Sequence, residues 1–201
     1  MTIVPTILLA AGESTRMGQS KALLDWHGQA LIQYQVHTIL DAGCQEIIVV
    51  LGHQAGILSP LVPQHPNVHV VVNRDYRAGK TTSILLGLRQ ISSDLAGVVI
   101  MGVDQAGSKE TFVSLVSAFR ERRPPIAVPS YCGQSGHPPV FDRALIPELI
   151  DITEETYGIR SVVERYRDKR LIVDVDDPLV LLNLNTPTDY RLAKDLTAPR
   201  E

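Results

Sequence analysis

The chain has 201 residues, of which 44% are hydrophobic and 20% are charged, and its formal net charge is −3. This composition excludes a disordered chain, and a weakly acidic chain without a basic cluster is not expected to bind nucleic acid. The length favours a single domain over residues 1–201 with a sizeable core.

Apolar runs that read as buried strands alternate with helical patterns along the chain. The expected strands are 3–9, 47–51, 68–72, 98–101 and 126–128, and the expected helices are 30–42, 81–91 and 110–122. Another helix is expected to begin at Thr186-Pro187, with Thr as the cap. Such alternation predicts the α/β class, here a three-layer Rossmann-like fold with a mostly parallel central sheet. Ligands are then expected beyond the carboxyl ends of the strands.

The first expected strand leads into small residues and then two cations. Ala10, Ala11 and Gly12 add little side-chain bulk, so the backbone can approach a ligand and point N–H groups at phosphate oxygens. Arg16 can bind phosphate bidentately, and Lys21 adds a compact charge. The pattern favours a triphosphate site; the alternative is an ordinary strand-to-helix turn with solvated charges.

This segment fits neither a dinucleotide fingerprint nor a Walker A loop. It resembles the signature loop of the MobA-like nucleotidyltransferases, L-A-[AG]-G-x-S-x-R-M-G-x-x-K, which holds the nucleoside triphosphate. The resemblance implies that the nucleotide contacts Leu9, Ala10, Ala11, Gly12, Arg16 and Lys21. Ala11, in place of a second Gly, resembles the CTP-using branch of the family, which makes molybdopterin cytosine dinucleotide.

Two later segments resemble the nucleotide side of the same family. Gly52 is followed by His, as in the family, which implies a nucleotide contact at Gly52; the alternative is a glycine after the strand together with a helix cap. The next segment resembles N-x-x-[WY]-x-x-G-x-x-x-S and implies nucleotide contacts at Asn73, Gly79 and Ser83. Lys80 is not typical of this pattern, and it either adds a phosphate contact or is solvated. A P-loop kinase is rejected, because Arg74 stands where that motif needs Gly.

The fourth expected strand ends at a carboxylate. Asp104 is well placed to hold Mg²⁺, since hard cations take oxygen ligands, and a helix cap is the alternative role. Asp104-Gln105 resembles the D-Q-P of the CTP branch, although Ala106 replaces the Pro. Near the end of the chain, a match to [DN]-x-[DN]-T-P-x-D implies Asn185 as the second metal ligand, with Asn183 as the second choice. Bracing the turn is the other reading of Asn185.

The turn-rich stretch after residue 128 resembles the loop that faces the second substrate in the family, P-x-x-x-G-x-x-G-[HN]-P-x-x-F. The resemblance implies acceptor contacts at Gly136, His137 and Pro138. His137 either acts as a general acid or base or orients the pterin by hydrogen bonds. Arg160, in a weaker match, meets either an acceptor phosphate or an acidic neighbour.

Together the resemblances imply Mg²⁺-dependent transfer of CMP from CTP to the phosphate of molybdopterin, with release of pyrophosphate. Arg16, Lys21 and Asp104 are the implied catalytic residues, and Asp104 and Asn185 the implied metal ligands. A phosphate nucleophile is already ionised near neutral pH, so no covalent nucleophile or strong base is needed. A molybdoenzyme or its maturation chaperone is an implied further partner.

Other functions stay open. The two asparagines at 183 and 185 resemble the GTP branch and favour a guanylyltransferase of the same cofactor. Other family members act on sugar phosphates or other phosphorylated acceptors. A non-catalytic nucleotide- or cofactor-binding protein is disfavoured, because Arg16, Lys21 and Asp104 are all present.

The cysteines and the apolar runs indicate in which cellular compartment the protein is expected to work. Cys44 and Cys132 stand far apart with no CxxC spacing, which argues against a zinc site and a disulfide framework. No stretch is apolar for long enough to span a membrane, and the N-terminus lacks the basic segment of a signal peptide. We therefore expect a reduced, cytoplasmic protein without a membrane partner.

Overall fold

The computed structural model describes residues 2–197, and its centre is one mixed β-sheet. The strands follow the order β10-β7-β9-β6-β1-β4-β5, and β8 pairs with β7. Their bounds are Thr6–Ala10 (β1), Ile47–Leu51 (β4), Val68–Val72 (β5), Gly97–Gly102 (β6), Ile126–Tyr131 (β7), Gln134–Ser135 (β8), Val140–Asp142 (β9) and Leu171–Asp174 (β10). A separate antiparallel pair joins Asp25–Trp26 (β2) to Gln29–Ala30 (β3). The expected domain also includes residue 1 and residues 198–201, which lie outside the described part of the chain.

The expected strands are all present, and 47–51 and 68–72 have the expected bounds. β1 starts later than expected, at Thr6, because Pro5 has no backbone N–H to give to a ladder. The mostly parallel sheet is confirmed, since β1 pairs in parallel with β4 and β6, and β4 with β5. Short β9 runs antiparallel between β6 and β7, a reversal that an apolar run alone does not reveal.

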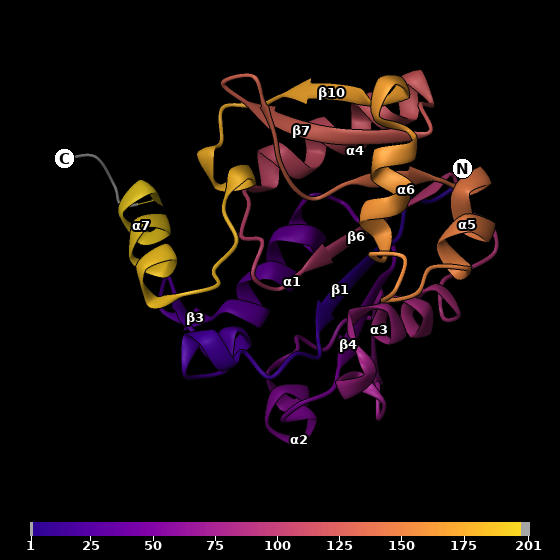
Figure 1. Cartoon of the computed structure of the whole chain (residues 1–201). Helices are drawn as coiled ribbons and strands as arrows, with labels where there is room; N and C mark the ends of the chain where they lie inside the picture. The colour runs from indigo at the N-terminus through magenta and orange to yellow at the C-terminus, as the bar shows by residue number, and fades with distance from the viewer. Residues whose placement is uncertain (1, 198–201) are drawn as a thin grey trace.

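Helices cover both faces of the sheet, so the three-layer arrangement is confirmed (Figure 1). Their bounds are Leu31–Asp41 (α1), Ala55–Leu58 (α2), Lys80–Leu88 (α3), Lys109–Arg122 (α4), Ile146–Ile150 (α5), Ile159–Arg165 (α6) and Pro187–Thr197 (α7). α1 and α4 pack on one face, and α3, α5 and α6 on the other. Alternate strand residues point to opposite faces, so Leu8 joins one buried cluster and Ile7 the other. No helix in the described part of the chain has the length and apolar character needed to cross a bilayer.

The predicted helix start after Thr186 is confirmed. α7 begins at Pro187, and Thr186 Oγ1 accepts a hydrogen bond from the N–H of Asp189 at 3.2 Å. The Asp189 carboxylate in turn accepts from the N–H groups of Thr186 and Asn185. This exchange satisfies free N–H groups at the helix start and holds Asn185 in place. α7 then lies beside the pair of β2 and β3, where Lys194 forms an ion pair with Asp25 of β2 (Figure 1).

The carboxyl ends of β1, β4 and β6 meet at one edge of the sheet. The Val103 N–H donates to the Leu9 carbonyl at 2.9 Å, and the His53 N–H donates to the Ala11 carbonyl at 2.9 Å. The segments that follow the three strands are therefore joined by backbone hydrogen bonds. In a sheet of this kind, ligands bind beyond this edge.

Candidate active site

The loop after β1 is held in a curled shape by its own hydrogen bonds. Ser14 adopts a left-handed conformation with a φ of 55°, and its carbonyl accepts from the Met17 N–H at 2.9 Å. Met17 is buried and anchors the loop to the core. Ser14 Oγ accepts from the Lys21 N–H at 3.1 Å, and this bond ties the end of the loop back to its middle. Small residues and two cations therefore share one loop of defined shape.

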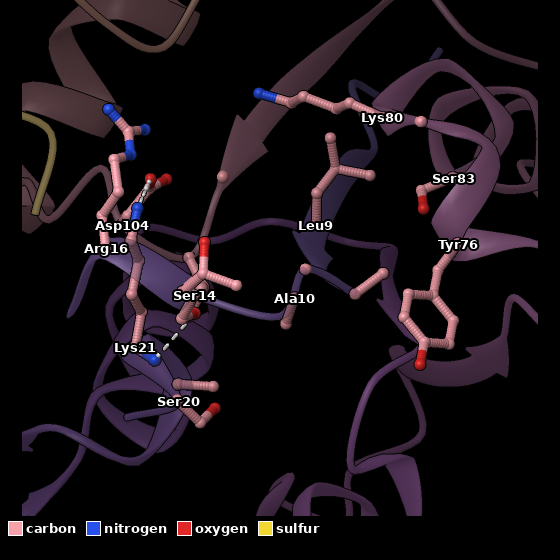
Figure 2. Close-up of a pocket in the computed structure, with 17 residues that line it drawn as sticks. Leu9, Ala10, Ser14, Arg16, Ser20, Lys21, Tyr76, Lys80, Ser83 and Asp104 are labelled. Atoms are coloured by element: carbon pink, nitrogen blue, oxygen red, sulfur yellow. Dashed lines mark hydrogen bonds and ion pairs between the residues drawn. The ribbon is translucent and has the colours of Figure 1, made fainter. Parts of the chain in front are cut away.

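Residues from three distant segments converge on the Lys21 ammonium. Lys21 Nζ lies 2.7 Å from Asp104 Oδ2 and 2.8 Å from Asn185 Oδ1. Arg16 donates to the same Asn185 oxygen at 3.1 Å. The Lys21 and Asp104 side chains keep only 13% and 23% of their exposure, so their ion pair is partly shielded from water. The structure thus brings the expected catalytic residues and Asn185 to one point, and Figure 2 shows Lys21 and Asp104 joined there.

The oxygens around Lys21 fit a divalent cation. One carboxylate and one amide oxygen meet at a single positive charge, which shows that this point favours a cation. Both are hard oxygen donors of the kind that Mg²⁺ takes, and Mg²⁺ commonly uses few protein ligands together with water and substrate phosphates. Among residues 2–197, no group of three or more His, Cys, Asp or Glu side chains is arranged to hold a metal. Asp104 and Asn185 are therefore placed so that they could hold such an ion together with water and substrate phosphates.

The turn that carries Asp104 is held by hydrogen bonds from α1 and from the segment before Asn185. Gln35, buried on α1, donates to the carbonyls on either side of Asp104 at 3.1 and 2.9 Å. The Asp104 carbonyl accepts from the Leu184 N–H at 2.9 Å. Ala106 is buried at the end of the turn. These bonds hold the turn even though Ala106 replaces the Pro of the family pattern.

A recess of about 310 Å³ opens beside the loop. It is lined by most of the expected nucleotide-binding residues, namely Leu9, Ala10, Ala11, Gly12, Arg16, Lys21, Gly79 and Ser83, and also by Asp104. Figure 2 shows Ser14 and Lys21 on one side of it and Tyr76 and Ser83 on the other, with Ala10 between them. Sequence reasoning did not assign Ser14, Ser20 or Tyr76 to the site; their signal was their place inside the matched motifs.

Gly52 and Asn73 do not line this recess, although both were expected to bind nucleotide. A Cβ on Gly52 would lie 2.8 Å from the Cβ atoms of Ala11 and Tyr76, so Gly52 lets the β4 end pack against the back of the recess. Asn73 is buried and donates to Thr82 Oγ1 and Ser83 Oγ at 2.8 and 2.9 Å. Both residues support the walls rather than face the space.

Two further recesses lie beside the residues that are expected to contact the acceptor. One, of about 380 Å³, is lined by Lys80, His137, Glu154 and Arg160, together with residues of the Asp104 turn and α6. The other, of about 730 Å³, is more apolar and also contains His137 and Arg160, with Gly136 at its wall. Pro138 is buried after a cis peptide bond and lines neither. Of the residues expected to contact the acceptor, Gly136, His137 and Arg160 therefore line the same recess, and Pro138 does not.

Although His137 is an exposed residue, the groups around its ring favour the uncharged form. Desolvation by the walls of the recess lowers the pKa of the imidazole, and the charge of Lys80 lowers it further. Asp104 acts in the opposite direction, and Arg160 adds to the lowering. At neutral pH the imidazole is therefore suited to hydrogen bonding rather than to carrying positive charge.

Glu154 is a site residue that sequence reasoning missed. Its Oε1 accepts from the Thr81 N–H at 2.7 Å and from Thr81 Oγ1 at 2.9 Å, and it thereby caps α3. Gly79 has a φ of 122° and packs directly against the Glu154 side chain, so no larger residue fits there. Nothing in the local sequence marks Glu154, because it caps a helix that begins far away in the chain.

The chain resembles characterised proteins along most of its length. It is 32% identical to nicotine blue oxidoreductase of Paenarthrobacter nicotinovorans over 183 residues, which cover 87% of the chain and 86% of that protein. It is 24% identical to molybdenum cofactor cytidylyltransferase of Escherichia coli (strain K12) over 199 residues, which cover 97% of each.

A solved structure has the same fold. Rv0371C of Mycobacterium tuberculosis H37Rv, determined in complex with manganese, superposes with a TM-score of 0.75 and 25% identity, covering 96% of this chain and 99% of that one. Residues 6–170 match the sequence profile of the MobA-like NTP transferase domain, which is most of the chain. The chain therefore belongs to the family of MobA-like NTP transferases.

Proposed function

We propose that this nucleotidyltransferase moves CMP from CTP to the phosphate of a molybdopterin-type acceptor. The observation that supports this transfer best is the convergence of Arg16, Lys21, Asp104 and Asn185 at the end of a loop of small residues. Such a cluster suits a triphosphate on one side and a metal on the other. An oxygen of the acceptor phosphate attacks the α-phosphorus, the bond from that phosphorus to the bridging oxygen breaks, and pyrophosphate leaves.

The protein would act by positioning and by neutralising charge. The loop backbone, Arg16 and Lys21 would bind the β- and γ-phosphates, which become the leaving group. Asp104 and Asn185 would hold the divalent ion, which when bound supplies Lewis-acid charge at the phosphates. Lys21 now bridges those two oxygens, so it would turn toward the phosphates in the loaded enzyme.

CTP is proposed as the nucleotide from sequence, and the acceptor is proposed from sequence and from the lining of one recess. Ala11 and Asp104-Gln105 resemble the CTP branch, and the relative from Escherichia coli that bears the cytidylyltransferase name matches over the whole chain. Asn183 and Asn185 resemble the GTP branch, so GTP is the alternative nucleotide. The recess that contains Gly136, His137 and Arg160 has a mostly apolar lining with a few polar groups, which suits a flat, phosphorylated heterocycle.

A second candidate function comes from the 32% identical relative, which is named as an oxidoreductase of nicotine blue. Reduction of a flat, conjugated substrate could use the same apolar recess near His137 and Arg160. Such a reaction would have no need for the ion pair of Asp104 with Lys21. Loss of the colour of nicotine blue with a nicotinamide reductant, unchanged by Asp104→Asn, would support this function against transfer.

The proposed transfer is tested by pyrophosphate release with Mg²⁺ and each of CTP, GTP, ATP and UTP, with and without molybdopterin. Release with CTP and molybdopterin only is the expected result. Asp104→Ala should abolish it, whereas Asp168→Ala, an exposed carboxylate outside the recesses, should not. Pyrophosphate release with GTP instead would assign the protein to the GTP-using branch. If none of the four nucleotides released pyrophosphate, the proposed transfer would be contradicted.

We also propose that the protein works in the cytoplasm. It also makes a molybdoenzyme or its maturation chaperone the expected recipient of the product. Co-purification of the dinucleotide-loaded protein with such a partner is the observation that would support this step.

A further inference from the structure

We propose that Lys80 is a catalytic cation that contacts both substrates, binding the attacking phosphate of the acceptor and the α-phosphate that it attacks. This role rests on the proposed transfer reaction. No feature of the family pattern assigns it, since Lys80 is not typical of the segment in which it stands.

The position of Lys80 joins the two halves of the site. It is the first residue of α3, and its side chain lines both the nucleotide recess and the acceptor recess of about 380 Å³. Figure 2 shows the side chain extended past Leu9, with the ammonium on the side where Arg16 and Asp104 lie. Lys80 thus reaches into the space where the two phosphates would have to meet.

The Lys80 ammonium is available for a ligand, unlike the other cations at the loop. Lys21 is bonded to Asp104 and Asn185, and Arg16 is bonded to Asn185. Among residues 2–197, no hydrogen bond or ion pair engages Lys80 Nζ. An uncommitted ammonium between two recesses, one of them lined by phosphate-binding backbone, is placed to bind an anion.

The start of α3 does not provide this anion site by itself. The Glu154 carboxylate already accepts from Thr81 N–H and Thr81 Oγ1, so an internal anion occupies the helix N-terminus. No hydrogen bond or ion pair joins Glu154 to Lys80 in the described residues. The side-chain charge of Lys80, rather than the helix terminus, is therefore free to act on a phosphate.

The electrostatics of the recess agree with this role. The protein atoms around the Lys80 ammonium lower its pKa by desolvation, Asp104 opposes that effect, and the charges of Lys21 and Arg160 add to it. Two incoming phosphates would favour the charged form again. Glu154 and His137 also face the same space.

The chemistry gives the cation a specific task. Two anionic phosphates must approach each other before the new P–O bond can form, and their repulsion opposes that approach. Arg16 and Lys21 would bind the β- and γ-phosphates, which leave as pyrophosphate. Lys80 lines both recesses, so it would lie near the α-phosphorus and the attacking phosphate, where the new bond forms. A cation there binds the acceptor phosphate and also offsets this repulsion in the transition state, and removing one such contact commonly costs about 10²-fold in rate.

Lys80→Met, which keeps the length of the side chain and removes its charge, tests this role against Lys80→Arg and Lys169→Met. Lys169 is exposed and lines none of the recesses. We expect kcat of Lys80→Met to fall about 10²-fold, with the Kd of the nucleotide changed less than about threefold. Lys80→Arg should keep kcat within about tenfold, and Lys169→Met should match the wild type. A kcat of Lys80→Met within twofold of wild type would overturn the role.

A binding measurement separates this inference from the proposed function. Inorganic phosphate serves as the probe for the acceptor, titrated by calorimetry into protein saturated with Mg²⁺ and α,β-methylene CTP, which cannot release pyrophosphate. The wild type should bind phosphate at least about tenfold more tightly than Lys80→Met. If no nucleotide is transferred but this difference persists, the proposed transfer fails and the role of Lys80 in phosphate binding stands. Equal phosphate binding by the two proteins, or none by the wild type, would overturn it whatever the activity.

Discussion

At the scale of single residues, the Lys21 ammonium occupies the meeting point of two oxygen ligands. Asp104 contributes a full negative charge there, whereas Asn185 contributes only the partial charge of an amide. A divalent ion at this point would gain less from the amide than from a second carboxylate. The affinity for the ion should therefore depend on the residue at position 185.

Asn185→Asp should strengthen the binding of Mn²⁺ by about tenfold, because a second carboxylate faces the ion at close range. Titration of Mn²⁺ followed by electron paramagnetic resonance measures this directly. Asn183→Asp is the matched control, since the Asn183 oxygen accepts from Gln105 instead of Lys21. Equal affinities for the two variants would show that Asn185 does not face the ion.

The titration of His137 is a second prediction at this scale. Its pKa is lowered by desolvation first and by Lys80 second, so the imidazole should take up its proton at a pH below that of a free histidine, about 6.5. Lys80→Met removes one cause and should raise the midpoint. NMR titration of the ring signals gives both values. A wild-type midpoint at or above 6.5, or no rise in the variant, would contradict the arrangement.

At the scale of elements, the site is carried by strand ends and held by residues from other elements. Gln35 on α1 fixes the turn after β6 through two carbonyls. Gln35→Leu would leave those carbonyls without a partner and should cost about 1–3 kcal/mol of unfolding free energy. It should also lower kcat more than it changes the KM of the nucleotide, because the Asp104 turn would then be held only by the Leu184 N–H bond among the bonds described above. Urea unfolding and steady-state kinetics, with exposed Gln45→Leu as the control, measure both effects.

The start of α3 depends on Glu154 from a distant segment. Glu154→Ala removes the acceptor for the Thr81 N–H and should cost about 0.5–2 kcal/mol, the usual cost of losing a helix cap. Glu155→Ala should leave the free energy of unfolding nearly unchanged, since Glu155 is exposed and makes no such bond in the described residues. Equal effects of the two substitutions would show that the cap contributes nothing.

These elements also show how far sequence reasoning reaches. The strand at 47–51 could be predicted to the residue, because a short, fully apolar run has few other ways to be buried. β9 was not predicted, because three residues are too few to show a hydrophobic pattern. Its extended shape depends on hydrogen bonds to β6 and β7 on either side. The Glu154 cap was missed for the same reason, as its partner lies far away in the sequence.

At the scale of the whole molecule, the order of the strands brings distant segments to one edge. The first loop, the turn at Asp104 and the stretch at Asn185 were each predicted from their own motifs, and the parallel pairing of β1 with β4 and β6 places the first two together. Gly52 and Asn73 carry motifs as well, yet they lie behind the recess. A motif therefore locates a segment at the site without telling which of its side chains face the ligand.

The fate of the α-phosphate tests the central claim most directly. Incubation with molybdopterin, Mg²⁺ and CTP labelled with ³²P at either the α- or the γ-position follows each phosphate to its product. The mechanism predicts that the α-label enters the acceptor and the γ-label leaves as pyrophosphate, and that Asp104→Asn slows both steps together. Transfer of the γ-label to the acceptor, or acceptor that carries neither label, would contradict nucleotidyl transfer at this site.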